Sequence, residues 1–194
     1  MRETGVEAAA AHVGLDAIES DPDGVADTYR ALGCTDVVVP WLGPDHFASR
    51  EAVADAGARL AAAADALADR GCSLHYHNHD QEFVDVDGET GLDRLLAAAP
   101  TVGLEPDLGW AGVAGADPLA LLDRYAERVD LVHLKDYDAD AGEPAPVGEG
   151  DLDLDTTVSA VREHGVSWLV YEAEATPDSY DALERAERCL DRYW

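Results

Sequence analysis

Residues 129–136 read Val-Asp-Leu-Val-His-Leu-Lys-Asp, an apolar stretch that ends in ionisable side chains. Such a run is typical of a parallel β-strand that is covered on both faces. His133 and Lys135 stand at its carboxyl end, where α/β proteins place their binding groups. Lys135 is also the single lysine among thirteen basic residues, although lysine is usually one of the commonest residues. We therefore expect a site to hold it.

Working outward, similar apolar stretches recur along the chain and alternate with amphipathic helical stretches. The expected strands cover residues 6–13, 35–41, 73–79, 102–107, 129–136 and 166–172. The expected helix starts lie at Ser20 or Asp21, Ser49, Thr90, Asp117-Pro118 and Thr176-Pro177, all typical N-cap or N1 residues. Six βα units in succession predict a parallel sheet with right-handed crossovers. This periodicity fits a doubly wound sheet and a (β/α)₈ barrel equally.

The positions of the polar residues favour the barrel. A polar or aromatic side chain ends each expected strand: His12, Trp41, His77 with His79, Asp107, His133 and Glu172. A barrel brings the carboxyl ends of all its strands around one mouth, whereas an open sheet spreads them along a line. We expect these side chains to share one site.

Composition limits the classes of function. The chain has 194 residues, 20.6 kDa and a net charge of −28, a length that suits a single domain. Such a charge repels phosphate backbones and anionic membranes, so no nucleic-acid or membrane partner is expected. A halophilic surface explains the excess acid, because concentrated salt screens the repulsion. The sequence shows no apolar run long enough to cross a membrane and no signal-peptide pattern. Its three cysteines are too few for a disulfide framework. We expect a cytoplasmic protein.

Residues 74–83, 103–110, 132–138 and 170–174 suggest a metal site. Each ionisable residue in these segments has an ordinary explanation when it is taken alone: a solvated histidine, a turn aspartate before Gly109, or one more acid in an acidic chain. Together they place ionisable groups at the ends of consecutive buried strands, where such groups are paired or bind a metal. The candidates are His75, His77, His79, Asp107, His133 and Glu172. Mixed imidazole and carboxylate ligands suit a divalent ion such as Mn²⁺, Zn²⁺ or Co²⁺, with Mg²⁺ also considered.

At these residues the chain resembles the sugar phosphate isomerase/epimerase family of xylose isomerase-like barrels. The motifs that carry the resemblance are HNHDQEF (77–83), DLGW (107–110), HLKD (133–136), VGEGD (147–151) and the last strand with Glu172. The resemblance implies metal ligands at Asp107, His133 and Glu172. Its fourth ligand is a glutamate in many relatives, whereas this chain offers His77, with His79 and Glu82 close by.

The resemblance also implies a fold class, an α/β barrel of the xylose isomerase-like type. A complete barrel has eight strands and about 250 residues. Six units are expected here, so residues 1–194 are expected to form one N-terminally incomplete barrel domain that lacks the first two βα units. An opened wall predicts a homo-oligomer that covers the exposed edge; a gene fragment and an inactive remnant are the alternatives.

The expected activity is that of a metal-dependent isomerase or epimerase of a small sugar, sugar acid or keto-polyol. Glu172, with Glu82 or His79, would move a proton next to a metal-polarised carbonyl. An inosose-type dehydratase begins with the same proton abstraction and is the alternative at this site. An inactive truncated remnant is the alternative outside catalysis.

Four residues are expected to bind the substrate. Lys135 would hold a substrate oxygen or carboxylate, and Trp110 would stack on the apolar face of the sugar. His12 ends the first strand at the same mouth. Glu149 lies between Gly148 and Gly150 and would close over the mouth, although an ordinary turn explains the two glycines equally well.

Overall fold

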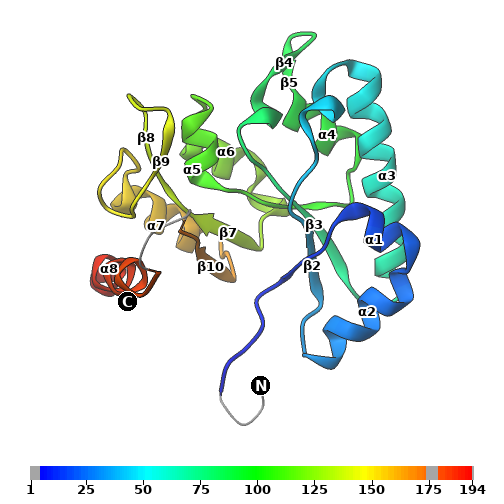
Figure 1. The fold of residues 1–194 in the computed structure, drawn as a ribbon, viewed down its shortest axis with the longest axis horizontal. Helices are drawn as coiled ribbons and strands as arrows, with labels where there is room; N and C mark the ends of the chain where they lie inside the picture. Colours follow the sequence, from blue (N-terminus) through cyan, green and yellow to red (C-terminus); the bar gives the residue numbers. More distant parts are fainter. Residues whose placement is uncertain (1–4, 174–178, 194) are drawn as a thin grey trace. The chain divides into compact units, whose positions relative to one another are not determined.

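The computed structural model describes residues 5–173 and 179–193 and divides the chain into two compact units (Figure 1). The N-terminal unit runs to Glu105, and the C-terminal unit begins at Pro106. Each unit is described by itself below.

The N-terminal unit is built on a parallel sheet of four strands in the order β1-β2-β3-β6. These strands are β1 (Ala11–His12), β2 (Asp36–Val39), β3 (Ser73–His77) and β6 (Gly103–Glu105). Its helices are α1 (Leu15–Ser20), α2 (Pro22–Ala31), α3 (Arg50–Ala68) and α4 (Gly91–Ala98), with 3-10 turns η1 (Pro44–Phe47) and η2 (Gln81–Phe83). Helices α1 to α4 lie to one side of strands β2 and β3 (Figure 1). The pairing places His77 opposite Glu105.

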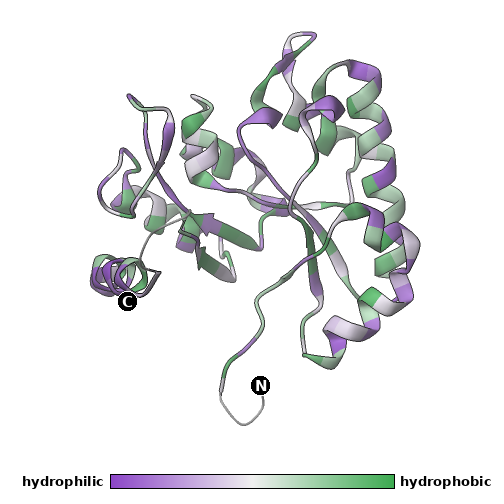
Figure 2. Ribbon diagram, viewed as in Figure 1, coloured by the Kyte–Doolittle hydropathy of each residue, from purple (hydrophilic) through white to green (hydrophobic). Residues whose placement is uncertain are grey.

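Side-chain caps start the main helices of this unit. Asp21 accepts a hydrogen bond from the Gly24 amide at 2.9 Å, and Ser49 accepts one from Ala52 at 3.2 Å. Thr90 caps α4 in the same way. Each cap satisfies an amide that the first helical turn leaves without a partner. Figure 2 shows hydrophobic and hydrophilic stretches that alternate along the α3 ribbon.

The C-terminal unit contains the parallel pair β7 (Leu131–Leu134) and β10 (Trp168–Tyr171). Asp107 forms a parallel bridge with His133, and the His133 amide donates to the Pro106 carbonyl at 2.9 Å. The helices are α5 (Leu108–Val113), α6 (Pro118–Tyr125), α7 (Leu154–Glu163) and α8 (Ser179–Leu190), with 3-10 turns η3 (Ala126–Arg128) and η4 (Asp191–Tyr193). Asp117 caps α6 as expected. The expected helix start at Thr176-Pro177 lies outside the described residues.

Two antiparallel hairpins were not expected from the sequence. Strands β4 (Asp85–Val86) and β5 (Glu89–Thr90) are joined by Asp87 and Gly88, which both have positive φ, as two-residue hairpin turns require. Strands β8 (Asp136–Asp138) and β9 (Glu143–Ala145) form the second hairpin. It divides the strand expected over 129–136, because β7 ends at Leu134.

The six expected strands correspond to β1, β2, β3, β6, β7 and β10, and all their pairings are parallel. The first is much shorter than expected, two residues instead of eight. The α/β fold class is thus confirmed. Among the described residues, the helices are too short or too polar for a bilayer crossing.

Candidate functional site

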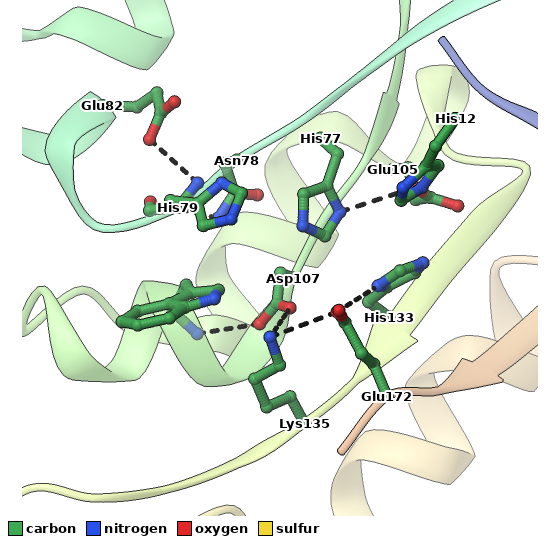
Figure 3. Close-up of polar contacts among 11 residues, drawn as sticks. His12, His77, Asn78, His79, Glu82, Glu105, Asp107, His133, Lys135 and Glu172 are labelled. Carbon is green, nitrogen blue, oxygen red and sulfur yellow. Dashed lines mark hydrogen bonds and ion pairs between the residues drawn. The ribbon is translucent and has the colours of Figure 1, made fainter. Parts of the chain in front are cut away.

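Three expected metal ligands converge in the C-terminal unit (Figure 3). Asp107 precedes α5, His133 lies in β7, and Glu172 directly follows β10. Each offers one ligand atom, and these atoms lie within 4.8 Å of one another. His133 Nδ1 is 3.0 Å from Glu172 Oε2. Asp107 is fixed by a second role, because its Oδ1 accepts the Trp110 amide at 2.8 Å and caps α5.

Lys135 lies between the two carboxylates of this cluster (Figure 3). Its Nζ is 3.1 Å from Asp107 Oδ2 and 3.2 Å from Glu172 Oε2, and only 2% of the side chain is exposed. The ammonium also lies 5.2 Å from the centre of the Trp110 ring. Gly109 permits this approach, since a Cβ there would come within 2.6 Å of Lys135 Cγ. The glycine of the DLGW motif therefore makes room for the lysine stem.

The cluster keeps Glu172 ionised. The hydrogen bond with His133 is the largest cause that lowers its pKa, and the charge of Lys135 adds to it. Partial burial acts in the opposite direction, but the pKa falls to about 2. Glu172 is thus a carboxylate at neutral pH, the form that binds a metal.

The donor set fits a divalent cation. It combines one imidazole and two carboxylates, which suits borderline or hard divalent ions. Asp107 is fully buried, and a buried carboxylate needs a positive partner. The ammonium of Lys135 supplies one between the two acids. The space between the carboxylates of Asp107 and Glu172 therefore favours a positive charge, as a metal site requires.

A second buried carboxylate fixes the VGEGD loop. Asp136 is fully buried, and its oxygens accept four backbone N–H groups at 2.9–3.1 Å, those of Tyr137, Gly148, Gly150 and Leu152. This network holds the loop on the β8 strand. The Glu149 side chain forms an ion pair with Arg185 of α8. Its contact with a substrate stays a prediction.

The N-terminal unit has its own cluster of His12, His77 and Glu105 (Figure 3). Glu105 Oε2 lies 2.8 Å from His12 Nε2 and 3.4 Å from His77 Nδ1. His77 and Glu105 are buried, whereas 39% of the His12 side chain is exposed. One ligand atom of each residue lies within 4.8 Å of the others.

The loop after β3 is organised around Glu82. This residue is completely buried, and its carboxylate accepts the Tyr76 hydroxyl at 2.5 Å and the His79 amide at 2.8 Å. Burial is the largest influence on Glu82 and raises its pKa to about 7. The His79 ring lies edge-on to Trp41, with 4.7 Å between ring centres. Glu82 therefore fixes the backbone that carries His79.

Sequence reasoning missed three residues of these networks: Tyr76, Glu105 and Asp136. Glu105 carried a usable signal, because it lies two residues before Asp107 and alternation predicts a shared face. His75 was grouped with His77 and His79 but forms a separate pair with Asp36 at 3.1 Å. Asp136 carried no signal beyond its place in the HLKD motif.

Comparison with known proteins gives a family match over most of the chain. A family model described as a xylose isomerase-like TIM barrel matches residues 23–192. The chain is 31% identical to the rhizopine catabolism protein MocC of Rhizobium meliloti over 68% of this chain and 46% of that protein. It is 29% identical to an inosose dehydratase of Lacticaseibacillus casei over 69% of this chain and 53% of that protein. The chain thus spans about half the length of the curated relatives it matches.

Solved structures agree on the fold. A sugar phosphate isomerase/epimerase from Parabacteroides distasonis superposes with a TM-score of 0.82 at 17% identity, covering 98% of this chain and 73% of that one. The IOLI protein with a bound zinc atom gives a TM-score of 0.69 at 18% identity over 92% of this chain and 71% of that one. At these identities the likeness shows the fold alone.

Proposed function

Because the chain belongs to the xylose isomerase-like TIM-barrel family, we propose that it is a metal-dependent sugar isomerase or epimerase. Its substrate would be a small sugar, sugar acid or keto-polyol, and the reaction would move a proton next to a carbonyl. The observation that carries the proposal is the cluster of Asp107, His133 and Glu172 beside the buried Lys135. Two acids, an imidazole and a fixed cation form a site for a polar, oxygen-rich ligand.

We assign the metal to Asp107, His133 and Glu172, with His77 of the N-terminal unit as the fourth ligand. The place of His77 in the HNHDQEF motif, at the end of an expected strand, supports this choice. A bound divalent ion supplies Lewis-acid polarisation of the substrate carbonyl. The zinc in the structurally similar IOLI protein supports a divalent ion, and its identity here among Mn²⁺, Zn²⁺, Co²⁺ and Mg²⁺ is left to experiment.

The remaining side chains divide the work of binding and proton transfer. Glu172, with its low pKa, acts mainly as a carboxylate ligand, since an efficient base has a pKa near the working pH. We assign the moving proton to His79, which is partly exposed, and Glu82 supports His79 through its backbone. Lys135 holds a substrate oxygen and Trp110 stacks on the apolar face of the sugar.

His12 and Glu149 complete the proposed binding site. The exposed edge of His12 can donate to a substrate hydroxyl while its Nε2 stays on Glu105. Glu149 would have to leave Arg185 to reach a substrate. We therefore rank His12 above Glu149 as a binding residue.

A dehydratase is the second candidate at the same site. Inosose dehydratases recur among the matching proteins at 28–30% identity. A dehydratase would remove the same proton α to the carbonyl and then expel a β-hydroxyl as water. The first step is shared, so the side chains named above serve both reactions.

The test is incubation of the protein and Mn²⁺ in deuterated water with ketopentoses, ketohexoses and inososes. An isomerase or epimerase returns sugar that has gained deuterium and lost no water, whereas a dehydratase yields a product lighter by one water. His133→Ala is the matched inactive control. Absence of metal-dependent exchange and of product across this panel would contradict the proposal and favour the inactive remnant.

Three further properties stay predictions. They are a cytoplasmic location, a halophilic surface and a homo-oligomer. Strand β1 is an outer strand of its sheet, and an outer strand exposes unpaired backbone groups that a second copy can cover. Light scattering in molar potassium chloride would test this, and a monomer of about 20 kDa with full metal-dependent activity would contradict it.

A further inference from the structure

Glu105 has no role in the function proposed above, although it is among the most deeply buried acids of the N-terminal unit. It is 1% exposed, and a buried carboxylate is kept only where partners compensate its charge. Two imidazoles do so at a single oxygen: His12 Nε2 at 2.8 Å and His77 Nδ1 at 3.4 Å from Oε2. A carboxylate shared by two histidines calls for an explanation.

Strand pairing builds the contact between Glu105 and His77 into the fold. The two residues are direct partners in the parallel register of β3 and β6. Paired residues on neighbouring strands project their side chains from the same face of the sheet. The contact is thus fixed by backbone geometry and does not depend on a flexible loop.

This contact favours a proton on Nδ1 of His77, which lies at an ion-pair distance of 3.4 Å from Glu105 Oε2. A neutral imidazole has one N–H donor and one lone pair, and the group that faces one nitrogen fixes the tautomer. A carboxylate oxygen only accepts, so Glu105 stabilises the tautomer that has the proton on Nδ1. The lone pair of His77 then lies on Nε2, the atom that can bind a metal. Outer carboxylates orient metal-binding histidines in this way.

We propose that Glu105 is a positioning residue that holds His77 in the Nδ1–H tautomer and presents Nε2 to the divalent ion. The proposal rests on the function proposed above, in which His77 is the fourth ligand. His12 supports Glu105, since its hydrogen bond to the same oxygen restrains the carboxylate and its ring lies 5.5 Å from that of His77.

The chain offers a matched control on the same strand. His75 precedes His77 by two residues, is equally buried, and has its Nε2 3.1 Å from Asp36 Oδ1 of β2. This pair is also an imidazole on a carboxylate, but His75 is not an assigned ligand. Asp36→Asn thus removes a comparable charge without touching the proposed ligand.

The first experiment measures the zinc affinity of the metal-stripped chain of residues 1–194 by competition with a chelator. Glu105→Gln should weaken zinc binding about 10- to 100-fold, the usual effect of losing an outer carboxylate, and Asp36→Asn should change it less than about 2-fold. Equal affinities of the two variants would overturn the proposal. Loss of zinc binding in His133→Ala separates this failure from failure of the proposed function, because that variant tests the ion site itself.

The second experiment reads the tautomer directly in the metal-free wild-type protein and needs no variant that must fold. Long-range ¹H–¹⁵N correlation spectra, with His77→Gln for assignment, should show Nδ1 protonated and Nε2 bare. A proton on Nε2 would overturn the proposal. So would a second bound zinc equivalent that disappears in both Glu105→Gln and His12→Gln while the first remains, since the cluster would then itself be an ion site.

Discussion

Glu82 and Glu172 each lie just beyond the carboxyl end of a parallel strand, yet their surroundings drive their acidities in opposite directions. In the N-terminal unit, burial dominates and raises the pKa of Glu82 to about 7. In the C-terminal unit, the hydrogen bond from His133 and the charge of Lys135 lower the pKa of Glu172 to about 2. The difference is that His133 and the cationic Lys135 outweigh desolvation at Glu172, whereas the hydrogen bonds that Glu82 accepts from Tyr76 and His79 do not outweigh its burial.

Such a separation of acidities assigns roles to otherwise identical side chains. Glu172 is permanently charged at neutral pH and is placed to bind a cation. Glu82 is inaccessible and holds a loop, so its acidity affects stability more directly than chemistry. The predictions below test whether these two roles can be broken independently.

The largest effect is expected from His133→Ala, which removes both a proposed metal ligand and the main partner of Glu172. Loss of an outer partner alone weakens metal binding about 10- to 100-fold, so loss of the ligand should exceed about 100-fold. The metal-dependent rise in melting temperature should disappear. Circular dichroism should show a nearly unchanged metal-free fold, and a retained zinc-induced rise would count against the ligand assignment.

Lys135→Met should destabilise the metal-free protein by about 3–5 kcal/mol, the usual effect of removing one partner of a buried ion pair. Asp107 would then be a buried carboxylate without its cation at 3.1 Å. Zinc should stabilise this variant more than it stabilises the wild type, because the ion supplies the missing charge. Chemical denaturation with and without zinc measures both effects.

Lys135→Arg is the control for that experiment because it keeps the positive charge. It should lose much less stability than Lys135→Met in the absence of zinc. Equal losses in the two variants would mean that packing of the lysine stem against Gly109, and not its charge, supports the cluster.

The structure brings together Asp107, His133 and Glu172, which the sequence singled out because they belong to distinctive motifs, and their role as metal ligands stays a prediction. Asp107, His133 and Glu172 end consecutive strands, and a single lysine in an acidic chain is conspicuous. The six parallel strands were predicted for the same reason, since continuous apolar runs are a strong local signal. These features depend on local sequence and on one general rule about strand ends.

Glu82→Gln should remove a pH dependence of stability that the wild type shows between about pH 5 and pH 8. The folded pKa of about 7 lies above the ordinary value of 4.5, so the folded state binds more protons than the unfolded state in this range. The stabilising contribution is complete below pH 4.5 and is lost as the pH rises through 7. The difference amounts to about 3 kcal/mol.

Urea denaturation of the wild type and of Glu82→Gln at about pH 5 and at about pH 8 measures this difference. Glu51→Gln is the control, because Glu51 is exposed on α3. The two unfolding free energies should diverge by about 3 kcal/mol between the two pH values. Parallel curves would mean that Glu82 stays ionised despite its burial, and would remove the contrast with Glu172.

The parts that the sequence did not predict depend on long-range pairing or on common residue types. Glu105 and Asp136 are two of forty-one acids, so composition gave no reason to select them. Glu105 pairs with His12, which is 93 residues away, and Asp136 accepts backbone amides as far along the chain as Leu152. The β4–β5 hairpin had a local Asp-Gly signal at residues 87–88, but its strands have only two residues each. Strands of that length show no periodicity.

The smallest expected effect is that of salt on stability, and it concerns the acids at the surface, whose environment differs from those of Glu82 and Glu172. Forty-one acidic residues against thirteen basic ones give a net charge of −28, and their repulsion is screened as the Debye length falls from about 10 Å at 0.1 M to about 3 Å at 1 M salt. We expect molar potassium chloride to stabilise the fold by about 1–2 kcal/mol, a rise in melting temperature of about 2–8 °C. Buried pairs are screened much less, so the loss of stability in Lys135→Met should persist in 1 M salt. A flat or falling melting temperature would contradict the halophilic surface, and a loss that vanishes in salt would place Lys135 among the surface charges.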